Sequence, residues 1–109
     1  MRYLVIMETA ENSVPMSPAD SVRHLETRVL PNHEQSIKLE KEGTIRGGCL
    51  VGRRGSAFVV EASSNDELSQ LLRAFPLWGL QMVEVTPLES FESRLSRDRE
   101  ALERVKKAV

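Results

Sequence analysis

The stretch SNDELSQLLRAFPLWGLQMVEVTPL, residues Ser64–Leu88, predicts a complete helix–turn–strand unit. Asn65 is a suitable helix cap, because its side-chain oxygen can accept a backbone N–H from the first turn. Three leucines then follow at the i, i+3, i+4 spacing of one apolar helix face. Pro76 ends the helix, because it has no N–H to donate. Residues 80–85 have the β-branched pattern of a strand, which Pro87 closes.

The same signals extend to the rest of the chain, which we interpret as one domain over residues 1–109. They predict a buried strand at 2–8, a polar loop at 9–16, a helix at 17–42 kinked near Pro31, a hairpin of strands at 44–51 and 56–62, and an amphipathic helical tail within 88–109. The order is β-α-β-β-α-β followed by an extra helix. Right-handed crossovers fold this order into an α+β, ferredoxin-like antiparallel sheet with both helices on one face.

The sheet face that carries no helices is predicted to bind a second subunit. The strand at 2–8 is apolar on both parities, with Tyr3, Val5 and Met7 on one and Leu4 and Ile6 on the other. An antiparallel sheet with one face in water should instead alternate polar and apolar residues. We therefore expect a partner's sheet to cover this face, which gives a dimeric α+β barrel in a homodimer or a higher homo-oligomer. The tail helix is expected to pack either on another subunit or on its own.

Composition narrows the function. The net charge is −1 and the aromatic share is 5%, so no nucleic-acid partner is expected. No apolar run approaches a membrane span, the N-terminal run is too short for a signal peptide, and the single cysteine fits a reducing compartment. We expect a cytoplasmic protein with no membrane partner. No metal or other cofactor is predicted, and His24 and His33 are too far apart in sequence for a metal pair.

Candidate catalytic residues are those that interrupt apolar patterns. Glu61 and Glu84 each stand on a strand face whose other residues are apolar. A carboxylate in an apolar cleft has a raised pKa because it is desolvated, which suits proton transfer near neutral pH. His33 lies on the inward stripe of the first helix, where imidazole can carry a proton. The alternatives are two solvated strand-end acids and a surface or hydrogen-bonded core histidine.

Each candidate ligand-binding residue also has a purely structural interpretation. Arg46 can pair with a substrate carboxylate or with a neighbouring glutamate. Trp78 lines a pocket mouth or anchors the core. Cys49 is more typical of a small buried apolar residue than of a nucleophile. The Arg53–Arg54 pair at the hairpin tip is interpreted as a solvated turn.

The 64–88 stretch resembles the muconolactone δ-isomerase family, in which a motif S-x-x-x-L-x-x-x-L-x-x-L-P-L-(aromatic)-x-x-x-x-(aliphatic)-E-V-x-x-L follows the third strand. The matching residues here are Ser64, Leu68, Leu72, Leu77, Trp78, Val83, Glu84, Val85 and Leu88. The resemblance also implies the dimeric α+β barrel. It further implies proton removal and redelivery in a small unsaturated lactone, without cofactor or metal, by residues such as Glu61, Glu84, His33 and Arg46.

One segment departs from the family pattern. The family's Trp-Arg-His-x-Trp run is here Ile45-Arg46-Gly47-Gly48-Cys49, which keeps only the arginine. This loss predicts a larger cleft with fewer polar partners. The leading hypothesis is a cofactor-free isomerase acting on a small, anionic molecule. The alternatives are a non-catalytic ligand-binding or assembly protein of the same fold, and a cofactor-independent oxygenase or decarboxylase acting on larger rings.

Overall fold

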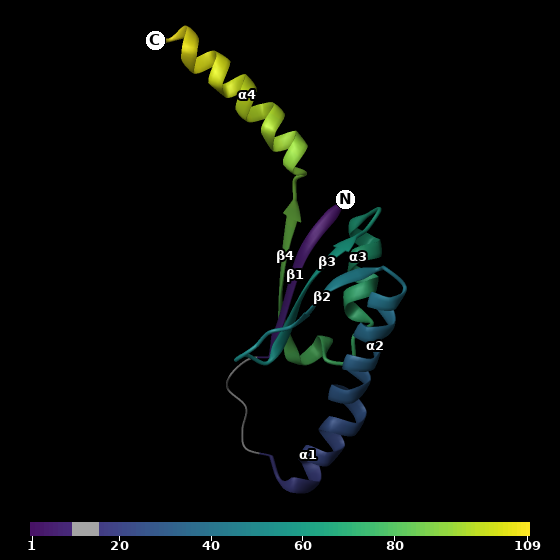
Figure 1. Ribbon diagram of the computed structural model, residues 1–109. Helices are drawn as coiled ribbons and strands as arrows, with labels where there is room; N and C mark the ends of the chain where they lie inside the picture. The colour runs from purple at the N-terminus through teal and green to yellow at the C-terminus, as the bar shows by residue number, and fades with distance from the viewer. Residues whose placement is uncertain (10–15) are drawn as a thin grey trace.

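The computed structural model describes residues 1–9 and 16–109, and it contains a four-stranded antiparallel sheet of order β2-β3-β1-β4 (Figure 1). The strands are β1 (Arg2–Thr9), β2 (Ile45–Cys49), β3 (Gly55–Glu61) and β4 (Gln81–Leu88). The helices are α1 (Pro18–His24), α2 (Leu30–Lys41), α3 (Asn65–Arg73) and α4 (Phe91–Lys107), with a π-helical turn η1 (Leu25–Val29) and a 3-10 turn η2 (Trp78–Leu80). This confirms the predicted α+β, ferredoxin-like order with an extra C-terminal helix. Most of the loop expected at 9–16 lies outside the described residues.

The core lies on one side of the sheet. β1 contributes Tyr3, Val5 and Met7, and α3 contributes Leu68 and Leu72, all of them buried. Figure 1 shows α2 and α3 together on this side, as predicted. Because strand side chains alternate between faces, the remaining residues of β1 point to the opposite side. No helix of the described chain covers that opposite side, which is called the open face below.

The open face is apolar in its middle. Its central residues Leu4, Ile6 and Val59 are half-buried by their neighbours, and Met82 on the edge strand β4 is 73% exposed. An exposed apolar sheet face of this kind is unusual in an isolated subunit. The prediction that a second sheet covers it stays open, since the structure contains one chain.

The start of α3 differs from the prediction. Ser64, rather than Asn65, is the N-cap, and its Oγ accepts the backbone N–H of Glu67 at 3.1 Å. Ser64 has the extended backbone of a cap, whereas Asn65 is already the first helical residue. Asn65 instead accepts a hydrogen bond from the hydroxyl of Tyr3 at 3.2 Å, which ties α3 to β1.

The predicted break near Pro31 is present as the π-helical turn η1. The N–H of Leu30 donates to the carbonyl of Leu25, five residues back, and α2 then begins with Pro31 in its first turn. Proline fits there, because the first helical N–H groups need no partner within the helix. The first helix is thus continuous in direction but locally widened.

The end of the chain departs from the prediction in one respect. Pro87 lies inside β4 rather than closing it, which is tolerated because β4 is an edge strand. Beyond it, α4 extends away from the sheet and buries none of its own residues (Figure 1). Within the described residues, no helix is both long enough and apolar enough to cross a membrane.

Candidate functional site

A cavity of about 1170 Å³ lies between the first helical segment and the sheet. One wall contains Leu25, Val29, His33 and Ile37, four of the five residues that the helical spacing predicts to face inward. The fifth, Val22, does not line the cavity and is 52% exposed. The other wall is formed by β2, β3 and the hairpin that joins them. Leu25 and Ile37 are each about half exposed, at 47% and 53%. The stripe therefore faces an open cleft rather than a packed core.

β2 carries two small residues, Gly47 and Cys49, on the strand parity that lines the cavity. Ile45, Gly47 and Cys49 are alternate residues on the strand and all line the cavity. These are the positions at which the family pattern has two tryptophans and a histidine. A Cβ on Gly47 would overlap the backbone oxygen of Ala57 and lie 2.6 Å from the Cα of Phe58. A histidine at position 47 would therefore not fit without moving β2 away from β3.

Three hydrogen bonds hold the helical wall in place. The Oδ1 of buried Asn32 accepts the backbone N–H of Leu77 at 3.2 Å. The side chains of Arg28 and Gln35 donate to the carbonyls of Pro76 and Ala74, each at 3.3 Å. All three bonds join the first helical segment to the turn that follows α3. The residue next to Asn32 is His33, so these contacts also fix the backbone that presents the imidazole.

His33 and Cys49 meet across the cavity. The Nδ1 atom of His33 lies 3.9 Å from the Sγ atom of Cys49, within the range of a hydrogen bond to sulfur. Both side chains are exposed to the cavity rather than buried. When Nδ1 carries the proton and donates to sulfur, Nε2 is left as an acceptor. When the thiol S–H instead donates to Nδ1, Nε2 carries the proton.

Cys49 lines the candidate cavity, which its sequence context does not predict. The strand pattern favours a small buried residue, but the side chain of Cys49 is exposed. The signal was present in the strand period, because Cys49 is four residues beyond Ile45 and so shares its face. What the sequence did not show is that this face borders a cavity rather than packed side chains.

The other predicted site residues do not line this cavity. Arg46 lies between two cavity-facing residues of β2 and so points to the open face, where it is paired in register with Val59. Glu61 and Glu84 are on the same face, paired in register with Arg2 and Ile6. Arg46 and Glu84 are on opposite edge strands, three strand spacings apart and offset by two residues in register, which places them about 16 Å apart. Their catalytic and binding roles remain predictions.

Trp78 belongs to the core side of the molecule. It is half-buried against the main hydrophobic cluster and does not line the cavity. The guanidinium carbon of Arg73 lies 5.6 Å from the centre of its ring, in cation–π range. These contacts match an anchor for the turn after α3.

Two carboxylates with lowered pKa lie outside the cavity. The pKa of Glu67 is below its ordinary value because the Oγ and N–H of Ser63 donate to it. The pKa of Glu89 is lowered chiefly by the hydrogen bond from Arg94. Both groups stabilise helix starts. In residues 1–9 and 16–109, no group of three or more His, Cys, Asp or Glu side chains is arranged to hold a metal ion.

Comparison with known proteins agrees with this fold. A crystal structure of muconolactone isomerase superposes with a TM-score of 0.65 at 26% identity, covering 83% of this chain and 90% of that chain. A 5-chloro-2-hydroxyhydroquinone dehydrochlorinase from Burkholderia phenoliruptrix AC1100, in complex with 2,5-dihydroxybenzoquinone, gives 0.60 at 20% identity, covering 85% and 98%. No curated protein sequence matches. The family profile described as muconolactone delta-isomerase matches residues 1–94, and the chain therefore belongs to that family.

Proposed function

We propose that this protein is a cofactor-free isomerase that moves a double bond in a small, anionic ring compound by proton transfer. The observation that carries the proposal is the placement of His33 beside Cys49 on the wall of the cavity, in a chain of this family. An imidazole near neutral pH can both remove and return a proton. No metal or other cofactor is required for such a step.

The proposed reaction uses the free nitrogen of His33. Nε2 removes a proton from the γ carbon of the α,β-unsaturated lactone, and the electrons move through the double bond into the carbonyl oxygen as a dienolate. The same nitrogen then returns the proton to the α carbon next to the carbonyl, so the double bond migrates and no atom is gained or lost. Cys49 acts as the positioning residue in this scheme, because its sulfur accepts Nδ1–H and fixes the tautomer.

Glu61, Glu84 and Arg46 form the second candidate set of site residues. They lie on the open face, which we propose is covered by the sheet of a second copy in a homodimer. The apolar middle of that face, around Leu4 and Ile6, supports this arrangement. In such a dimer these charged groups border the space between the two sheets, separate from the cavity that contains His33.

The test compares single substitutions. The double-bond migration of muconolactone can be followed by its ultraviolet absorbance, with the wild-type chain, His33→Gln, Glu61→Gln and Glu84→Gln. Loss of a general acid–base group typically costs about 10²–10⁴-fold in rate. We expect that loss in His33→Gln only, with the melting temperature of each variant as the control. If His33→Gln kept full turnover and a glutamate variant lost it, the active site would instead lie on the open face.

A second candidate function is favoured by one observation. The cavity is larger than a small lactone acid requires, because the aromatic residues of the family pattern are missing from Ile45, Gly47 and Cys49. A ligand-binding protein without catalysis, or a cofactor-independent oxygenase or decarboxylase acting on a larger ring, fits this volume. Tight binding of a two-ring ligand with no turnover of muconolactone by any variant would favour the binding protein.

A further inference from the structure

We propose that Arg54 is the specificity-determining residue of the cavity, where it binds the carboxylate of a ring-carboxylate ligand at the hairpin end. The inference rests on the proposed function only for the assignment of the cavity as the substrate site.

The hairpin tip is anchored at Arg54 itself and at the next residue, Gly55. The backbone N–H of Thr9 donates to the carbonyl of Arg54 at 2.8 Å, and that of Leu50 donates to the carbonyl of Gly55 at 2.8 Å. Gly55 is also packed tightly against β1, because a Cβ there would lie 2.9 Å from the Cα of Glu8. The backbone that carries Arg54 is therefore held by the sheet, although the side chain itself is exposed.

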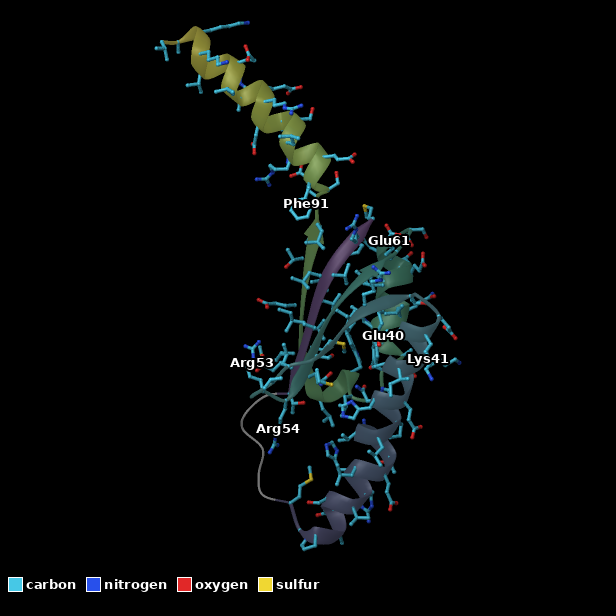
Figure 2. The ribbon with its side chains drawn as sticks, viewed as in Figure 1. Glu40, Lys41, Arg53, Arg54, Glu61 and Phe91 are labelled. Atoms are coloured by element: carbon cyan, nitrogen blue, oxygen red, sulfur yellow. The ribbon has the colours of Figure 1, made fainter. Side chains whose placement is uncertain are left out.

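The two arginines of the tip have different partners. The Nε of Arg53 lies 3.6 Å from a carboxylate oxygen of Glu8, whose side chain is on the open-face parity of β1. Arg54 makes no ion pair with any carboxylate in residues 1–9 and 16–109. Figure 2 shows Arg54 below the hairpin tip, toward the helices, and Arg53 on the outer side. Among the described residues, Arg53 is thus paired with a carboxylate and Arg54 is not.

The charged residues along the cavity also favour the hairpin end as the binding position of an anionic group. Arg53 and Arg54 line it at the hairpin tip, whereas Glu40 lines it near the last turn of α2. Glu40 is seven residues beyond His33, which is about 10 Å along the helix. A ligand carboxylate is attracted to the Arg54 end and repelled from the Glu40 end. Its ring is then placed beside His33 and Cys49.

The guanidinium group of Arg54 favours a carboxylate over a neutral group in the ligand. A guanidinium presents two parallel N–H donors that match the two oxygens of a carboxylate. A neutral amide of the same shape offers one acceptor and no charge. The cavity should therefore prefer a ring carboxylate over the isosteric ring carboxamide. Because Arg54 is exposed to solvent, that preference should weaken as salt is added.

The experiment measures the binding of 1-naphthoate and 1-naphthamide by titration calorimetry at low and high salt. The proteins are the wild-type chain, Arg54→Gln and two matched controls outside the cavity, Arg99→Gln and Arg104→Gln on α4. We expect the wild type to prefer naphthoate by roughly tenfold, as for one charge-assisted hydrogen-bonded contact. Arg54→Gln should remove the preference at an unchanged melting temperature, and both controls should keep it.

Two results would overturn the inference. One is a naphthoate preference that survives in Arg54→Gln or is lost in either control. The other is a wild-type protein that does not distinguish the two probes at low salt. The outcome is separable from that of the proposed function. An Arg54-dependent preference with no isomerase activity leaves this subsite standing, and His33-dependent activity that is insensitive to Arg54 leaves the isomerase standing.

Discussion

Buried Asn32 on α2 accepts the backbone N–H of Leu77 at 3.2 Å, and this bond joins the helical wall of the cavity to the turn after α3. The two residues are 45 positions apart, so neither predicts the other from sequence. Asn32 is the one buried polar residue among the described part of the chain. Its neighbour His33 is the proposed base. The position of the base thus depends on a hydrogen bond to the turn after α3.

Replacing Asn32 should destabilise the protein. Asn32→Ala leaves the N–H of Leu77 buried without a partner, and an unsatisfied buried donor costs about 1–3 kcal/mol. The free energy of unfolding in urea measures this loss. The matched control is Gln35→Ala, which removes an exposed hydrogen bond from the same helix to the same turn. Equal stability losses in the two variants would show that the buried contact is not the stronger one.

Replacement by alanine should destabilise the protein at Gly47 but not at the neighbouring Gly48. Gly47→Ala places a Cβ against the backbone of β3, and relief of such overlap by moving a strand costs about 1–3 kcal/mol or more. Gly48→Ala places its Cβ in open space, with nothing within 4 Å. We expect a lower melting temperature for the first variant and little change for the second. A Gly47→Ala protein as stable as Gly48→Ala would contradict the close approach of β2 and β3.

Filling the cavity should exclude larger ligands. Cys49→Trp restores an aromatic residue of the family pattern on a wall of the cavity and takes up part of its volume. We expect naphthoate to bind at least roughly tenfold more weakly to this variant, because overpacking of a site costs 1–3 kcal/mol. Cys49→Ser, which keeps the side-chain size, is the control for the loss of sulfur. Unchanged affinity in Cys49→Trp would place the ligand elsewhere.

The stability contributed by Glu67 should depend on pH. Hydrogen bonds from Ser63 lower its pKa in the folded protein below the ordinary value of 4.5. The contribution is therefore fully present above about pH 4.5 and is lost as the pH falls through the lowered folded value. The difference in melting temperature between wild type and Glu67→Gln should be constant from neutral pH to pH 5 and shrink in more acidic buffer. Glu100→Gln, on exposed α4, corrects for the lost charge. A difference that grows on acidification would reverse the assigned sign.

The tail helix should promote self-association. Leu95 and Leu102 are about half exposed on one face of α4, and Phe91 is 95% exposed. Uncovered apolar side chains in such a row favour packing on a second subunit. We expect the double substitution Leu95→Gln and Leu102→Gln to lower the assembly mass measured by light scattering. The control pair, Ser96→Gln and Glu103→Gln, changes the polar face. Equal masses would show that α4 does not hold the subunits together.

The sequence by itself determined the element order, the sheet with helices on one face and the break before Pro31. These features follow from hydrophobic period, helix caps and proline, which act over a few residues. The 64–88 stretch was sufficient to place α3 and β4, with errors of one residue at the cap and of one proline at the strand end. The family pattern in the same stretch was sufficient for the family, which the profile match over residues 1–94 confirms.

Tertiary structure alone decided which polar residues share a site. His33, Cys49 and Arg54 come from a helix, a strand end and a hairpin tip, and they line one cavity only because β2 packs against the first helical segment. Glu61, Glu84 and Arg46 have equally suitable chemistry but point to the other face of the sheet. Strand period gives the alternation between faces, yet it does not say which face borders a cavity. That depends on long-range packing, which no local pattern encodes.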